Sequence, residues 1–96
     1  MILENGCKYD YESGCIVIYM NKPKIINESL KGRDVTIDNI HLGVDEFVNK
    51  RGVTMLSFSG VVRGSFSDFR STIIYLRSRI TNEVQSLSDK YRKYNR

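Results

Sequence analysis

The last third of the chain carries a long amphipathic pattern. Eight apolar residues recur at spacings of three or four, within about 80° of one another on a helical wheel: Phe69, Ile73, Leu76, Ile80, Val84, Leu87, Tyr91 and Tyr94. This stripe predicts one C-terminal helix over residues 65–94. Ser65 or Ser67 can cap it, and Asp68 in the first turn suits the positive end of the helix dipole.

Residues 1–62 show the shorter patterns that are typical of strands. The segment Cys15–Met20 is rich in β-branched residues and apolar on both faces, which predicts a strand. Lys24–Asn27 is expected to pair back as a hairpin. Val44–Val48 fits either a strand or a helical turn, and the polar segment Tyr9–Gly14 is predicted to be a loop.

Two longer segments predict further strands. In Asp34–Leu42 the alternation breaks after Ile37, so a bulge or bend is expected at Asp38-Asn39. Asn49–Gly52 has the composition of a hairpin turn. It precedes Val53–Val62, the longest predicted strand, in which a bulge near Met55-Leu56 would bring the apolar residues into alternation.

Several strands followed by one helix predict an α+β fold. We expect a small antiparallel β-sheet, or a partly open barrel or sandwich, packed against one long C-terminal helix. The length of 96 residues predicts a single domain, residues 1–96, mostly β over 1–62 and helical over 65–94. A chain of this size buries only about 60–65% of its unfolded surface, and oligomerisation would enlarge that core.

The charge of the chain is concentrated at its C-terminal end. Residues 1–62 hold seven Lys and Arg and eight Asp and Glu, a net charge of −1. Residues 63–96 hold eight Lys and Arg and three Asp and Glu, a net charge of +5. A basic segment favours nucleic acid or an acidic partner. The basic residues are spread around the predicted helix, however, and those in its last turn also suit the helix dipole.

The two cysteines, Cys7 and Cys15, bear on the compartment. The N-terminal residues resemble no secretory leader, and the longest apolar run has six residues, far too few to span a membrane. We therefore expect a cytoplasmic protein with reduced thiols that are not required for folding. A Cys7–Cys15 disulfide would form only after release from the cell.

The sequence contains no recognisable catalytic constellation. His41 is the only histidine, and it has no flanking signature of an acid or nucleophile partner. Asp45-Glu46 is interpreted as part of a solvated loop. The Gly60, Gly64 and Ser65 segment lacks the spacing and the lysine of a phosphate-binding loop. We expect no enzymatic activity, no cofactor, no metal site, no membrane contact and no small-molecule substrate.

The six tyrosines are the most distinctive feature of the composition. Tyrosine and arginine are enriched at protein interfaces, because they bury much area and still offer a polar group. Aromatic rings among basic residues also suit stacking on nucleic-acid bases. The interface candidates are the helix end and the N-terminal loop: Tyr91, Tyr94, Arg92, Lys93, Arg96, Tyr9 and Tyr11.

About 30 residues carry a resemblance to a known family. The run Lys50-Arg51-Gly52-Val53-Thr54-Met55-Leu56-Ser57-Phe58-Ser59-Gly60-Val61-Val62 is followed by Ser65-Phe66-Ser67-Asp68-Phe69-Arg70 and then by Ile73, Ile74 and Leu76. This resembles the N-terminal module of tailed-phage distal tail and baseplate proteins. The resemblance implies a small β-barrel or sandwich with one helix, assembled in rings. Unlike family members, this sequence shows no strands after its helix, and the helix is longer.

Two functions from different classes are therefore expected. The first is a non-enzymatic structural or assembly protein of a phage tail or baseplate, found in the host cytoplasm or the virion and acting through homo-oligomeric or partner contacts. The second is a small phage or mobile-element protein that binds nucleic acid, or a host or defence complex, through its basic C-terminal helix.

Overall fold

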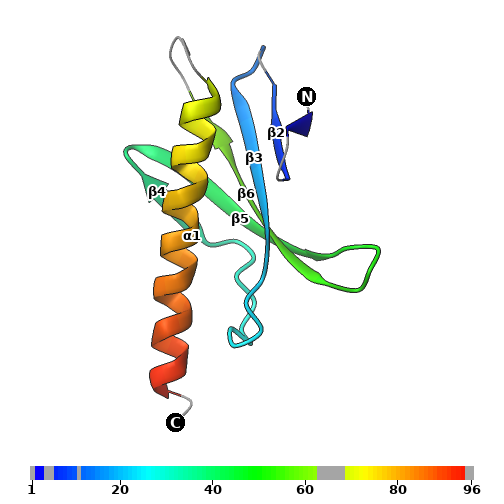
Figure 1. Cartoon of the computed structure of the whole chain (residues 1–96), viewed down its shortest axis with the longest axis vertical. Coiled ribbons are helices and arrows are strands. Elements are labelled where there is room, and N and C mark those ends of the chain that lie inside the picture. The colour runs from blue at the N-terminus through cyan, green and yellow to red at the C-terminus, as the bar shows by residue number, and fades with distance from the viewer. Residues whose placement is uncertain (1, 4–5, 11, 63–68, 95–96) are drawn as a thin grey trace.

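A curved antiparallel sheet and one long helix form two layers (Figure 1). The computed structural model describes residues 2–3, 6–10, 12–62 and 69–94. The elements in chain order are β1 (Ile2–Leu3), β2 (Cys7–Tyr9), β3 (Cys15–Asn21), β4 (Asp34–Ile37), β5 (Ile40–Val48), β6 (Thr54–Val61) and α1 (Phe69–Tyr94). The expected α+β class, with one long C-terminal helix, is confirmed.

The six strands form one sheet in the order β1-β2-β3-β6-β5-β4, with every neighbouring pair antiparallel. The central pairs are continuous: β3 and β6 align from Cys15↔Val61 to Asn21↔Met55, and β5 and β6 align from Gly43↔Ser59 to Val48↔Thr54. Among the described residues no pairing joins β1 to β4. Of the expected alternatives, the structure is therefore the open sheet.

A tight hairpin turn lies at Asp38-Asn39, where the sequence predicted a single strand with a bulge or bend. Asp38 and Asn39 both have positive φ, 49° and 69°, and they connect β4 directly to β5 with Ile37 paired to Ile40. Two consecutive residues with positive φ are the signature of a type I′ turn, which Asp and Asn tolerate better than other side chains. The broken alternation thus marked a reversal of the chain, not a bulge.

The hairpin turn predicted at Asn49–Gly52 is confirmed. The Asn49 side chain accepts hydrogen bonds from the backbone N–H groups of Arg51 and Val53, at 2.9 and 3.0 Å, and Gly52 has a φ of 80°. The ambiguous segment Val44–Val48 belongs to β5.

Two other local predictions were wrong. Lys24–Asn27 forms no strand; it lies in a long connection, residues 22–33, between β3 and β4. No bulge interrupts β6, because Met55 and Leu56 are successive members of an unbroken register. Leu56 faces the core, whereas Met55 lies on the opposite face of the sheet, where the sequence pattern gave no reason to expect an apolar residue.

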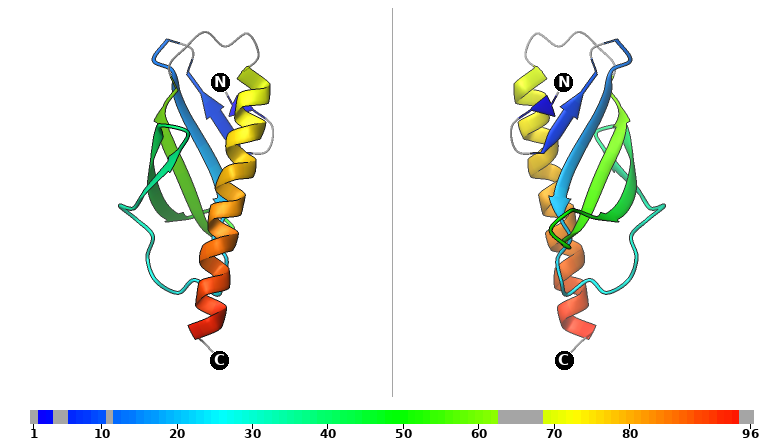
Figure 2. Two further views of the ribbon diagram at one scale, coloured as in Figure 1. Left: turned by 90° about the vertical axis from the view of Figure 1, so that its left-hand side faces the viewer. Right: turned by 90° about the vertical axis from the view of Figure 1, so that its right-hand side faces the viewer.

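The core lies between α1 and one face of the sheet, which we call the inner face (Figure 2). The helix contributes Ile73, Leu76, Ile80 and Val84, all less than 9% exposed, and Leu87 and Tyr91 pack against the core at its margin. The sheet contributes a matching set of buried residues: Cys7, Tyr9, Ile16, Ile18, Ile37, Leu42, Val44, Leu56, Phe58 and Val62. The expected stripe is thus the helix's contact with the sheet. The side chains of Phe69 and Tyr94, and the expected capping residues 65, 67 and 68, lie outside the described residues.

Gly60 allows the sheet to curve at the end of β6. A Cβ atom at this position would overlap the backbone carbonyl oxygen of His41 and would lie 2.9 Å from the Leu42 Cδ2 atom. Only glycine permits β5 to pass this close to β6. Gly60 thus lies in β6, within the strand that the sequence predicted over Val53–Val62.

The helix stripe provides a stability prediction with a matched control. Ile80 is fully buried, and Ile74 on the same helix is 68% exposed. We expect Ile80→Ala to lower the free energy of unfolding by about 2–4 kcal/mol, because it leaves a cavity in the core. Ile74→Ala should lower it by less than about 0.5 kcal/mol. Urea denaturation followed by circular dichroism measures both, and equal urea midpoints for Ile80→Ala and wild type would contradict this assignment.

Candidate protein-interaction surfaces

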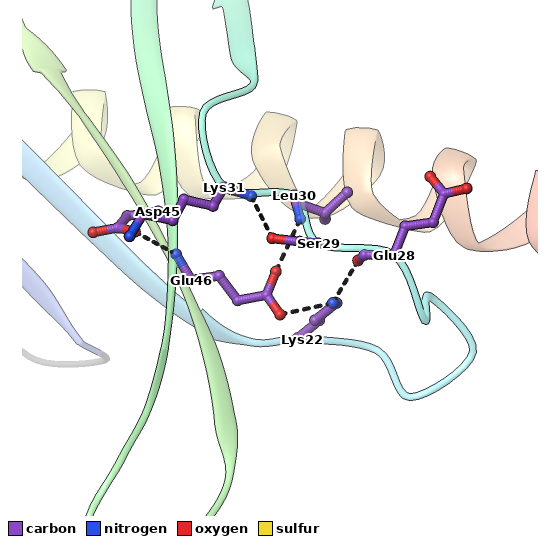
Figure 3. Close-up of polar contacts among 7 residues, drawn as sticks. All are labelled: Lys22, Glu28, Ser29, Leu30, Lys31, Asp45 and Glu46. Atoms are coloured by element: carbon purple, nitrogen blue, oxygen red, sulfur yellow. Dashed lines mark hydrogen bonds and ion pairs between the residues drawn. The ribbon is translucent and has the colours of Figure 1, made fainter.

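The connection of residues 22–33 is fixed by one partly buried ion pair. Glu46 is paired with Leu56 in the sheet register, so its side chain lies on the inner face, with the core. Its Oε1 atom lies 2.8 Å from Lys22 Nζ, and the two side chains are only 18% and 9% exposed. The Leu30 N–H donates to the other carboxylate oxygen at 2.9 Å, and Lys22 also donates to the Glu28 carbonyl oxygen at 2.6 Å (Figure 3).

This network gives Glu46 a structural role. The hydrogen bond from Lys22 and then that from the Leu30 N–H lower the pKa of the Glu46 carboxyl group. With the connection held in this way, Ile26 and Leu30 enter the core at 2% and 3% exposure. The interpretation of Asp45-Glu46 as a solvated loop was therefore wrong: both residues lie in β5, and only Asp45 is exposed.

The helix end is only partly available to a partner. Tyr91 is half-buried and packs against the core, and a hydrogen bond with Glu28, together with burial, raises the pKa of its phenol. Glu28 also lies 3.6 Å from Arg33. Tyr91 thus ties the helix to the connection of residues 22–33. We therefore expect the loss of its ring to affect folding as well as any contact with a partner.

The basic side chains of the helix have different surroundings. Arg79 donates to the Tyr75 hydroxyl at 2.7 Å and lies 3.6 Å from Asp38, and Tyr75 donates to Asp38 in turn. These bonds join the helix to the β4–β5 turn. Arg92 and Lys93 are exposed, and Arg92 lies 3.9 Å from Asp89 in a weak surface pair. Tyr94 ends the helix; its side chain and residue Arg96 are outside the described residues.

Tyr9 is the candidate that the structure places differently. It is the last residue of β2, pairs with Ile16 and is 5% exposed, so its ring belongs to the core and not to a polar loop. The strand is only three residues long, and its buried–exposed–buried pattern is too short to be recognised against the polar residues that follow. The neighbouring candidate, Tyr11, lies outside the described residues.

The two cysteines lie on opposite faces of the sheet. Cys7 pairs with the buried Ile18 on the inner face, and burial raises the pKa of its thiol. Cys15 is three residues from Ile18 on β3, so its side chain lies on the other face. Neither thiol is in a disulfide bond. Because the side chains point away from each other, this fold excludes a Cys7–Cys15 disulfide within one molecule.

The face of the sheet that α1 does not cover, which we call the outer face, carries aromatic and apolar side chains, of which Phe47 is exposed and Tyr19 and Met55 are half-buried. Tyr19 and Phe47 meet edge to face, with ring centroids 5.9 Å apart and planes at 88°. Phe47 is 38% exposed, and Met55 is its partner in the register. We call Tyr19, Phe47 and Met55 the outer patch. Lys8 Nζ lies 5.5 Å from the centroid of the Tyr19 ring.

This patch was not predicted from the sequence as an interaction surface. One signal was present, since β3 is apolar on both faces, as expected of a strand that is covered on both sides. The members of the patch, however, come from three different strands. Only the register of β3, β5 and β6 brings them together.

The described residues provide little for other kinds of site. They contain no group of three or more His, Cys, Asp or Glu that could hold a metal ion. In the described part of the chain, no helix is both long and apolar enough to cross a membrane. His41 lies exposed on the outer face, with Nδ1 3.2 Å from the Thr36 hydroxyl. Comparisons with protein-family models, with curated proteins and with solved structures found no match.

The Glu46 network leads to a prediction about pH. Because the folded-state pKa of Glu46 is lowered, its contribution is present above the unfolded-state pKa and is lost as the pH falls through the folded value, below about pH 4. We expect Glu46→Gln to lower the free energy of unfolding by about 1–3 kcal/mol at pH 7, since Lys22 loses its partner. The difference from wild type should shrink at about pH 3.5.

Asp45→Asn is the control for this prediction. Asp45 is the neighbouring carboxylate, exposed and 3.9 Å from Lys31. Such exposed pairs contribute little, so this variant should match wild type in urea denaturation at both pH values. A Glu46→Gln protein as stable as Asp45→Asn at pH 7 would contradict the role assigned to Glu46.

Proposed function

We propose that this chain is a non-enzymatic assembly protein, which acts through protein–protein contacts with its own copies or with another protein. The observation that carries the proposal is the outer face: a broad sheet surface that no other described element covers, on which Phe47 is exposed and Tyr19 and Met55 are half-buried. Two-layer folds bury one face of a sheet under helices, and an uncovered face with aromatic side chains is available for a partner.

The composition of the outer patch supports this function. Tyr, Phe and Met are enriched in the cores of protein interfaces, because they bury a large area at a low cost in side-chain entropy. A single exposed apolar residue would be unremarkable. Here Tyr19 contacts Phe47, and Phe47 lies opposite Met55, so that the patch is continuous.

The tail or baseplate setting is part of the proposal and rests on the resemblance of residues 50–76 to phage distal tail and baseplate modules. That segment contains β6 and the first part of α1. It thus includes Met55 of the outer patch and the start of the helix stripe. A phage assembly protein would meet its partners in the host cytoplasm and remain with them in the virion.

Photo-crosslinking tests whether the outer face meets a protein. With p-benzoylphenylalanine in place of Phe47, irradiation of cells that produce the protein should give a discrete protein adduct, containing either a second copy or another protein. The same amino acid in place of Ser86, which is exposed on the helix, is the matched control and should give little adduct. Equal, diffuse crosslinking at both positions would contradict the proposal.

A second function is favoured by the exposed cations of the helix end. Lys90, Arg92 and Lys93 are all exposed, and Arg92 alone of the three has an ion pair among the described residues, at 3.9 Å. Such a group could contact the phosphates of a nucleic acid or the acidic surface of a host or defence complex. We rank this second because Arg79, on the same helix, is already bound to Tyr75 and Asp38.

Salt dependence separates nucleic-acid binding from protein assembly. We expect a fluorescent random oligonucleotide to bind only weakly at physiological salt, and reversal of Arg92, Lys93 and Arg96 to Glu to leave assembly intact. Binding through phosphates would instead be micromolar, would fall steeply with salt, and would be abolished by the reversals. Fluorescence anisotropy as a function of salt concentration measures this binding. Micromolar, salt-sensitive binding that the reversals abolish would favour nucleic-acid binding over the assembly proposal.

A further inference from the structure

One row of residues on the outer face has opposite charges on β2 and β4, and beyond Lys8 the row continues to Ile2 of the edge strand β1. The registers align Lys8 with Val17, Val17 with Ser59, Ser59 with Gly43 and Gly43 with Asp34. Lys8 is therefore on β2, two strands to one side of β6, and Asp34 is on β4, two strands to the other side. Both charged residues are exposed.

This arrangement fits a second copy of the same chain. In a two-fold symmetric dimer, residue i of one copy meets residue j of the other, and j meets i. If two outer faces stack about an axis that runs along β6, each side of the sheet lies over the opposite side of its partner. Lys8 of each copy then faces Asp34 of the other. A two-fold axis perpendicular to the strands would instead place Lys8 of one copy opposite Lys8 of the other, so that like charges meet.

We propose that two copies pack outer face to outer face about this axis. The inference rests on the proposed function and specifies its partner. The outer patch supports the same choice of axis. Tyr19, Phe47 and Met55 lie toward one end of the strands, the end of the Asn49–Gly52 turn. An axis along β6 keeps that end over the same end of the partner, so the two patches meet. The cross-strand axis would separate them.

The centre of the face allows close approach. The row has Ser59 and Gly43 at its middle positions, on β6 and β5, and the row beside it has Ser57 on β6 next to the exposed Asp45 on β5. Small residues there let two sheets come together near the axis, in the aligned packing of a β-sandwich. The strands β2, β3, β6, β5 and β4 have 3, 7, 8, 9 and 4 residues, and at about 4.8 Å by about 3.4 Å per residue they give roughly 500 Å² per copy. The total of about 1,000 Å² is at the lower limit for specific interfaces, so we expect a weak dimer.

A charge swap tests this geometry. We expect sedimentation equilibrium to show a wild-type dimer with a Kd in the micromolar range, which weakens as salt rises. Lys8→Glu should raise the Kd about tenfold or more, because the introduced carboxylate faces that of Asp34, and Asp34→Lys should do the same by opposing two ammonium groups. The double variant Lys8→Glu/Asp34→Lys should restore a Kd within about threefold of wild type, since each pair is again complementary.

Matched variants control for general charge and folding effects. Lys90→Glu makes the same change of charge as Lys8→Glu at an exposed helix position, and it should leave the Kd unchanged. Circular dichroism should give the same fold for every variant. This matters for Lys8, whose ammonium group lies over the Tyr19 ring. Phe47→Ser is an independent variant that should weaken the dimer without changing any charge.

Several outcomes would overturn the inference. A monomeric wild type at about 100 µM, well above the micromolar Kd that we expect, would do so. So would a dimer that neither single charge variant weakens, or a double variant that stays as weak as the single ones. These results leave the proposed function standing if crosslinks from position 47 still reach another protein. If position 47 also gives no discrete crosslink to a protein, both the dimer and the proposed function are contradicted.

Discussion

The packing of the α1 stripe on the inner face of the sheet is the contact on which the rest of the structure depends. Ile73, Leu76, Ile80 and Val84 cover sheet residues that could not otherwise be shielded from water. A single helix of 26 residues provides one whole layer of the fold. In so small a protein this one contact contributes a large share of the buried apolar area.

The same constraint explains where a partner can bind. One helix covers only one face, so the outer face keeps Phe47 exposed and Tyr19 partly exposed, together with small central residues and opposite charges on β2 and β4. Each of these has a place in a symmetric contact. The helix is also longer than the strands it covers (Figure 1), and the connection of residues 22–33 packs against its far end. That basic end is a less organised surface, because the ring of Tyr91 is already engaged by the core and by Glu28.

The local elements whose signals are periodic or compositional could be predicted from the sequence. The helix stripe, strand β3 and the Asn49–Gly52 turn are of this kind, because hydrophobic period and turn chemistry act over a few residues. Short or irregular segments could not be predicted. β2 has only three residues, and the Asp38-Asn39 turn was interpreted as a bulge or bend within one strand, because broken alternation alone does not distinguish these from a hairpin turn.

The sequence by itself thus determined the helix, the main strands and their α+β class, whereas the tertiary structure alone decided how distant segments meet. It placed Glu46 on the inner face beside Lys22, buried the ring of Tyr9 and put Cys7 and Cys15 on opposite faces. It also assembled the outer patch and placed opposite charges on β2 and β4 in one row. These relations depend on strand order and register, which are fixed by the best burial of the whole inner face and not by any local pattern.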